Sequence, residues 1–210
     1  MLLKRALFLV SAENEVEPLV EFAKVFKKRY NVKVDAVYVK DILKYDVFPV
    51  TVEGIGINLG TNFAYKEFRN IENKTFEKIK GRLEEEFSKV YTKEGESAEV
   101  ALEELKKYDL MVTVKNEKIS PYMKELLRSI YKPLIVLPNR KDFKIENLLL
   151  LDDGAYNANK TLFTFFYMFD EQKVNVLRVN VEADESNEKL SERFGDNYNL
   201  ILKGEIPSKQ

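Results

Sequence analysis

The feature that most constrains the fold is a repeated alternation between short apolar runs and apolar residues at helical spacing. Residues 7–10 form a short apolar run, and apolar residues then recur at the three- and four-residue spacing of a helix across residues 16–26. A second run, rich in β-branched residues, covers residues 32–39. Strands that alternate with helices are typical of a parallel sheet covered by helices. The chain is therefore predicted to begin with a strand–helix–strand unit.

This alternation continues to about residue 138 and then restarts. Beyond a loop-like stretch, the spacing predicts helices at 76–87, 98–105 and 119–130 and strands at 89–92, 110–114 and 134–137. The polar residues 139–146, which follow Pro138, are predicted to be a linker. The restart predicts strands at 148–151, 174–179 and 198–202 and helices at 157–169 and 185–194.

We interpret the restart as an internal repeat. Val10 is matched with Leu151 and Val39 with Val179. The interval between the two matched positions is one residue shorter in the second copy. The predicted domains are a complete module at 1–138 with an insertion at 43–73, the linker at 139–146, and a partial module at 147–210.

Composition excludes several classes of chemistry. The sequence has no cysteine and no histidine, which removes disulfides, thiolate nucleophiles, Cys/His zinc sites and imidazole catalysis. A net charge of -1 gives no general attraction to nucleic acid or to an anionic membrane surface. The apolar residues 6–10 are too few for a signal peptide, and no apolar run is long enough to cross a bilayer. We expect a cytoplasmic protein that is not an enzyme, with no metal site.

Four short motifs occur in the order and spacing of a known family. They are the sequences EGESAEVAL at 94–102, YDLMV at 108–112, KPLIVLP at 132–138 and LLLDDG at 149–154. With them the chain resembles the universal stress protein family, in a tandem arrangement of two modules. The resemblance implies an α/β fold like that of adenine nucleotide alpha hydrolases. This is a doubly wound parallel five-stranded sheet of order 3-2-1-4-5, here followed by a second, truncated copy.

Nucleotide-binding members of that family hold ATP with an aspartate after the first strand, with backbone at the end of the second, and with a glycine-rich loop after the fourth. Glycines let backbone N–H groups approach phosphate oxygens. In the first module Ala12 stands at the aspartate position, and residues 115–121 contain no glycine. Ser120 is instead expected to cap a helix that begins at Pro121.

The second module retains Asp153, Gly154 and Val179, the only cofactor-binding candidates, and the counterpart of the phosphate loop would lie beyond Gln210. The favoured interpretation of Asp153 is a cap for the following helix, and an adenosine contact is the alternative. We therefore expect no cofactor, with ATP disfavoured, and nominate no catalytic residue.

Two features point to assembly. Without fourth and fifth strands, the strand at 148–151 would leave an open sheet edge. This edge would be covered by the first module, by a second subunit or by a portion of the natural protein that this chain does not include. The helix at 157–169 is apolar nearly all round, which favours packing between modules or against another subunit over lining a pocket. Family members commonly dimerise through the fifth strand, here 134–137, so a homodimer with an unidentified protein partner is predicted.

The sequence thus predicts a universal-stress-protein-like cytoplasmic stress or regulatory factor that acts by dimerisation and partner binding. The alternative is an ATP-binding or slowly ATP-hydrolysing member of that family whose nucleotide switches its assembly.

Overall fold

The computed structural model describes residues 3–44, 58–153, 155–169, 172–179 and 185–203. The chain divides into two compact units. The first is Lys4–Phe143, and the second joins Met1–Leu3 with Lys144–Gln210.

The first unit is built on a five-stranded parallel sheet with the strand order β3-β2-β1-β4-β5. This confirms the predicted order 3-2-1-4-5. The central strand is almost fully buried because helices cover both faces of the sheet. The strands are β1 Arg5–Val10, β2 Lys33–Asp41, β3 Lys89–Gly95, β4 Leu110–Lys115 and β5 Leu134–Pro138.

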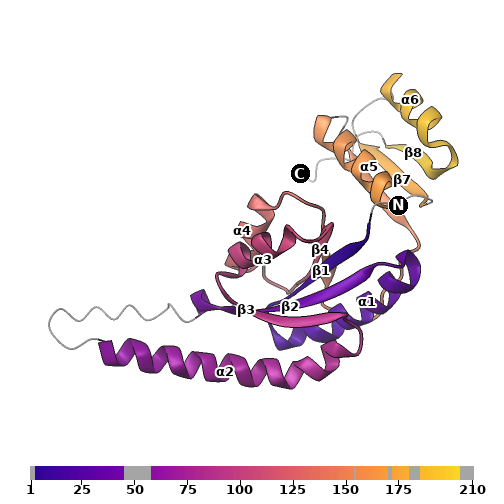
Figure 1. Cartoon of the computed structure of the whole chain (residues 1–210). Helices are drawn as coiled ribbons and strands as arrows, with labels where there is room; N and C mark the ends of the chain where they lie inside the picture. The colour runs from indigo at the N-terminus through magenta and orange to yellow at the C-terminus, as the bar shows by residue number, and fades with distance from the viewer. Residues whose placement is uncertain (1–2, 45–57, 154, 170–171, 180–184, 204–210) are drawn as a thin grey trace. The chain divides into compact units, whose positions relative to one another are not determined.

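Two helices cover each face of this sheet (Figure 1). On one face Phe8 of β1 contacts Phe22 of α1 and Phe87, which follows α2. On the other face Leu7 and Leu9 lie in a buried cluster with apolar side chains of α3 and α4. The helices are α1 Val16–Tyr30, α2 Asn58–Glu84, α3 Ser97–Leu105 and α4 Pro121–Ser129. Short 3-10 turns lie at Glu13–Glu15, Ile42–Lys44 and, in the second unit, Gly195–Asn197.

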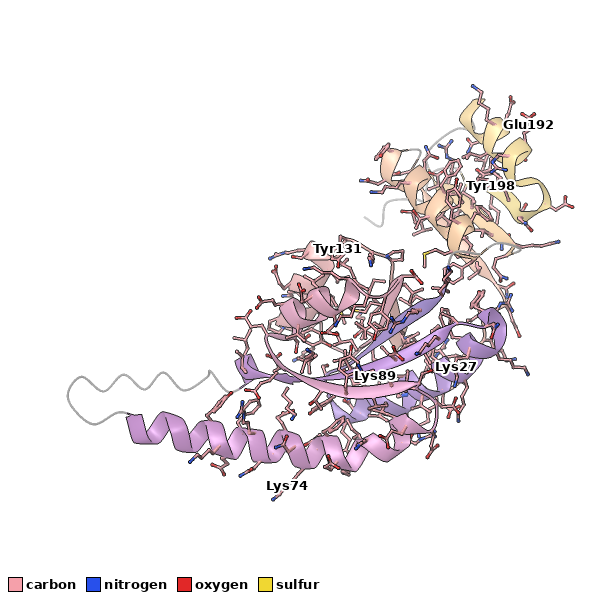
Figure 2. All side chains as sticks on the ribbon, in the orientation of Figure 1. Lys27, Lys74, Lys89, Tyr131, Glu192 and Tyr198 are labelled. Atoms are coloured by element: carbon pink, nitrogen blue, oxygen red, sulfur yellow. The ribbon has the colours of Figure 1, made fainter. Side chains whose placement is uncertain are left out.

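Helix α2 begins well before the helix predicted at 76–87. Residues 58–73, interpreted as part of an inserted loop at 43–73, are helical. The apolar periodicity of this part is weak because much of the helix faces solvent, as Lys74 does in Figure 2. Its buried contacts include Phe68 and Glu72, which accepts a hydrogen bond from Tyr38 of β2. Residues 45–57 of the predicted insertion lie outside the described residues.

The second unit contains a three-stranded parallel sheet of order β6-β7-β8, with β6 Leu148–Asp152, β7 Val174–Val179 and β8 Tyr198–Lys203. The helices α5 Tyr156–Met168 and α6 Glu185–Phe194 connect the strands. Both helices pack on one face, where Leu162 of α5 and Leu190 of α6 meet Val176 and Tyr198, the latter labelled in Figure 2. Right-handed crossovers between strands in sequential order place their helices on the same face. Among the described residues, no helix is both long and apolar enough to cross a bilayer.

The faces of β1 and β6 correct the register of the predicted repeat. Phe8 of β1 faces α1, the helix that follows it, and Leu150 of β6 likewise faces α5, the helix that follows β6. Val10 pairs with the second strand of its sheet as Asp152 does with the second strand of the other. Val10 therefore corresponds to Asp152, one residue later than the sequence match with Leu151. Because side chains alternate between faces, that one-residue difference turns Leu151 to the face without helices.

Candidate functional site

The candidate site lies where β1, β4 and β5 of the first unit end. Ligands of open α/β sheets bind outside the carboxyl ends of the strands, where crossovers to opposite faces begin. In the first unit this point lies between β1 and β4. Ser11, Glu15 and Asn116, which follow β1 and β4, form one hydrogen-bonded network here with Tyr122 of α4.

The centre of this network is the carboxylate of Glu15, which is fully buried at 0% exposure. Its Oε2 accepts hydrogen bonds from the backbone N–H groups of Ser11, at 2.8 Å, and Ala12, at 3.3 Å. The Ser11 hydroxyl donates to the same carboxylate at 2.9 Å, and Asn116 Nδ2 donates to Oε1 at 3.0 Å. The 3-10 turn Glu13–Glu15 folds the side chain back over the end of β1. An internal anion therefore occupies the N–H groups that follow β1.

A second layer of hydrogen bonds extends from Ser11 to Tyr122 of α4. The two hydroxyl oxygens lie 2.9 Å apart, and because Ser11 donates to Glu15, Tyr122 donates to Ser11. Burial raises the pKa of Glu15, and the hydrogen bonds from Ser11 oppose this shift. Burial also raises the pKa of Tyr122, and the nearby Glu15 charge adds to it. Glu15 can accept a proton from Ser11, but both side chains are buried.

Asn116, the first residue after β4, connects the loops that follow β1, β4 and β5 through side-chain hydrogen bonds. Its Oδ1 accepts from Asn14 Nδ2 at 3.2 Å and from Asn139 Nδ2 at 3.1 Å. Its Nδ2 donates to Glu15, so all polar atoms of its amide are used. Ser120 in the same loop accepts a 3.3 Å bond from the N–H of Met123, which confirms the predicted cap of α4. Side chains thus fill the place that a glycine loop would leave to phosphates.

In the second unit the two adjacent aspartates have different surroundings. Asp152 is buried, and its Oδ2 accepts from Arg178 Nε at 2.9 Å. Arg178 also donates to Asn187, whose Nδ2 donates to the hydroxyl of Tyr198 at 3.1 Å. Asp153 is exposed, and its Oδ1 accepts from the N–H of Ala155 at 2.9 Å, at the entrance to α5. The two side chains point to opposite sides, as alternation along a strand requires. Asp153 binds the backbone ahead of α5, whose N-cap residue is Ala155.

A shallow depression of about 460 Å³ lies beside Asp153 in the second unit. Its lining is partly apolar and partly polar, and consists of Leu150, Leu151, Asp152, Asp153, Asn157, Ala158, Thr161 and Leu177. Of the three predicted cofactor contacts, Asp153 lines this depression. Gly154 lies outside the described residues, and Val179 is the last residue of β7 and is not part of the lining. Among the described residues, no three acidic side chains are grouped so that they could hold a metal ion.

Sequence reasoning missed Glu15, Asn116 and Arg178. Glu15 falls between the first strand and its helix, where an acidic residue is ordinarily a solvated helix start. A signal was nevertheless present. Three residues before Glu15 the chain has Ala12, which cannot cap with its side chain, so a glutamate reaching back to backbone N–H groups is one remaining way to satisfy them.

Comparison with known proteins identifies the fold. No protein-family model and no curated protein matches this chain. Among solved structures, the chain is similar to the crystal structure of a universal stress protein from Archaeoglobus fulgidus DSM 4304. The TM-score is 0.67 at 11% sequence identity, and the match covers 99% of this chain and 80% of that one. At this identity the similarity concerns the fold alone, so the chain has a universal-stress-protein-like α/β fold.

Proposed function

We propose that this chain is a universal-stress-protein-like regulatory factor that works by self-association and partner binding, without catalysis and without a bound nucleotide. The observation that carries the proposal is the buried Glu15 carboxylate at the end of β1. A phosphate placed there would meet a negative charge in a poorly solvated setting, where like charges repel strongly. It would also find the N–H donors of Ser11 and Ala12 already used.

The loop after β4 supports the same proposal. Phosphate loops bind through backbone N–H groups that glycines leave accessible. Here residues 115–121 lack glycine, and Asn116 is held by three side-chain hydrogen bonds. Binding a triphosphate would break this network before any new contact formed.

The test is a thermal-shift titration of the full chain with ATP and Mg²⁺, repeated by calorimetry. A ligand at 100 times its dissociation constant stabilises a protein by about 2.7 kcal/mol, a shift of several degrees. We expect no shift at millimolar ATP. A saturable shift would contradict the proposal.

The alternative, an ATP-dependent member of this fold class, is favoured by one observation. Asp153 is exposed on the rim of the depression in the second unit, where an adenosine could contact it. If ATP does shift the melting curve, the variant Asp153→Ala decides between the sites. Loss of the shift would place the nucleotide in the second unit, and an unchanged shift would place it elsewhere.

Self-association is tested by sedimentation velocity at micromolar concentration, where we expect the dimer mass. The family's usual dimer strand corresponds to β5, which has one strand neighbour and exposes Val136. The variant Val136→Lys is therefore expected to dissociate a dimer formed there. A monomer mass for the unaltered chain would contradict the prediction of a homodimer.

A further inference from the structure

One face of the second unit's sheet carries apolar side chains that no helix covers within the part of the chain that the structure describes. Leu149 and Leu151 of β6 are 59% and 70% exposed. Leu177 of β7 and Ile201 of β8 share this face, because both helices pack on the alternate residues. At one end of the face the side chains of Asn175 and Asn199 bond to each other at 2.8 Å. Natural proteins seldom expose a contiguous apolar patch unless it binds something.

The adjoining edge of the sheet is open as well. Among the described strands, β6 pairs with β7 alone, so its other side presents unpaired backbone groups. Its residues 148–151 are four leucines, without the charges or prolines that usually protect an edge. The edge strand β5 of the first unit, by contrast, lies between Pro133 and Pro138. The open edge and the open face meet at β6.

The first unit shows what covers the corresponding surface. Leu7 and Leu9 of β1, the counterparts of Leu149 and Leu151, have no exposed surface. The helices α3 and α4 lie over them, and β4 pairs parallel with β1 along the edge. All of this cover comes from the continuous segment 97–129, which is a helix, a strand and a helix. Its inward side chains are small or flexible apolar residues, among them Ala98, Ala101, Leu105, Met123 and Leu126.

We propose that the open face and edge of the second unit form a docking site for a helix–strand–helix segment of a partner protein. The partner's strand adds parallel to β6, and its two helices cover the face with small apolar side chains, as 97–129 does in the first unit. The charged residues lie at the ends of the strands, Asp153 after β6 and Lys203 at the end of β8, so the matching surface is uncharged at its centre. A second copy of this chain cannot supply such a segment, because its own 97–129 is already packed. The proposal rests on the proposed function and specifies its partner.

The experiment uses a synthetic peptide of residues 96–139 as the probe and hydrogen exchange of the full chain as the readout. We expect the peptide to slow amide exchange in 148–152 at least tenfold, with residues 5–10 unchanged. A second form of the test appends 96–139 through a flexible linker, which raises the effective concentration to millimolar. No protection in either form would overturn the proposal.

Three variants make the result specific. Leu149→Lys and Leu151→Lys place a charge on the open face at positions where the side chain already reaches solvent, so the unit still folds. Each is expected to abolish the protection. Leu202→Lys changes a leucine that is also exposed, but on the helix-covered face of β8, and is expected to leave it intact. Protection of 148–152 in the chain alone that disappears on dilution, together with a dimer mass, would assign the site to a second copy and overturn the proposal. Because ATP is absent, failure here is independent of the nucleotide test.

Discussion

Removing the Glu15 carboxylate is the most direct test of how the first unit is held together at its strand ends. In Glu15→Ala the N–H of Ser11 and the Nδ2 of Asn116 lose their acceptor inside the protein. An orphaned buried donor costs about 1–3 kcal/mol, and the one lost methylene adds about 0.8 kcal/mol. Loss of the buried charge offsets part of this, since burial raises the pKa of Glu15. We expect a net loss of about 3 kcal/mol.

The assay is native-state hydrogen exchange in peptides from β1 and β4, because a chain of two units has no single unfolding free energy. A loss of 3 kcal/mol corresponds to roughly 150-fold faster exchange. Glu13→Ala is the matched control. Glu13 is half exposed and pairs with Lys78 at 2.6 Å, and such surface pairs contribute at most about 1 kcal/mol. Formate or acetate is expected to restore protection in Glu15→Ala by entering the vacated site.

Equal effects of the two substitutions would refute this reasoning, because they would show that the buried network contributes no more than a surface ion pair. A large effect without rescue by small carboxylates would show that the vacated cavity closes. It would then no longer support the inference that Glu15 occupies a place that an external anion could take.

Three further outcomes are expected. The folded state raises the pKa of Glu15 and so binds its proton more tightly. The loss of stability caused by Glu15→Ala should therefore be largest below about pH 4 and shrink as the pH rises through the raised pKa. A difference in stability that does not depend on pH would contradict this. Lys132→Met removes a donor to the carbonyl oxygens of Leu105, Lys106 and Tyr108, at and just beyond the end of α3, at 2.6 to 3.2 Å. It should cost about 1–2 kcal/mol, seen as faster hydrogen exchange in the first unit, against no measurable change for the exposed Lys124→Met. Arg178→Met leaves the buried Asp152 without its cation and should destabilise the second unit by about 3–5 kcal/mol, seen as faster exchange in β6 and β7 but not in β1.

The strands of the first sheet were predictable because they carry local signals, whereas their order was implied by the resemblance to the universal stress protein family. Residues 7–10 are apolar throughout, and residues 110–114 are apolar except for Thr113. The start of α2 was not predictable from periodicity. Over residues 65–75 its burial depends on single positions such as Phe68 and Glu72. A buried glutamate that is hydrogen-bonded to a tyrosine hydroxyl leaves no hydrophobic pattern in the sequence.

The contacts of the site were not predictable from the sequence. Residues 115–121 contain no glycine, and in the structure Asn116 of this loop accepts side-chain hydrogen bonds from Asn14 and Asn139. The contacts between Glu15 and Asn116 join residues 101 positions apart, and no local rule connects such positions. The register of β6 failed for a related reason, because a run of leucines looks the same on both faces of a strand.

That uniform strand gives the ion pair between Asp152 and Arg178 a consequence beyond its energy. If β6 slid by two residues along β7, leucines would still face the helices, so hydrophobicity alone would scarcely penalise the slip. The slip would carry the carboxylate of Asp152 away from the guanidinium of Arg178 and leave both charges in an apolar interior. The ion pair therefore fixes the register of β6 on β7, selecting one alignment among several that the leucines alone would allow.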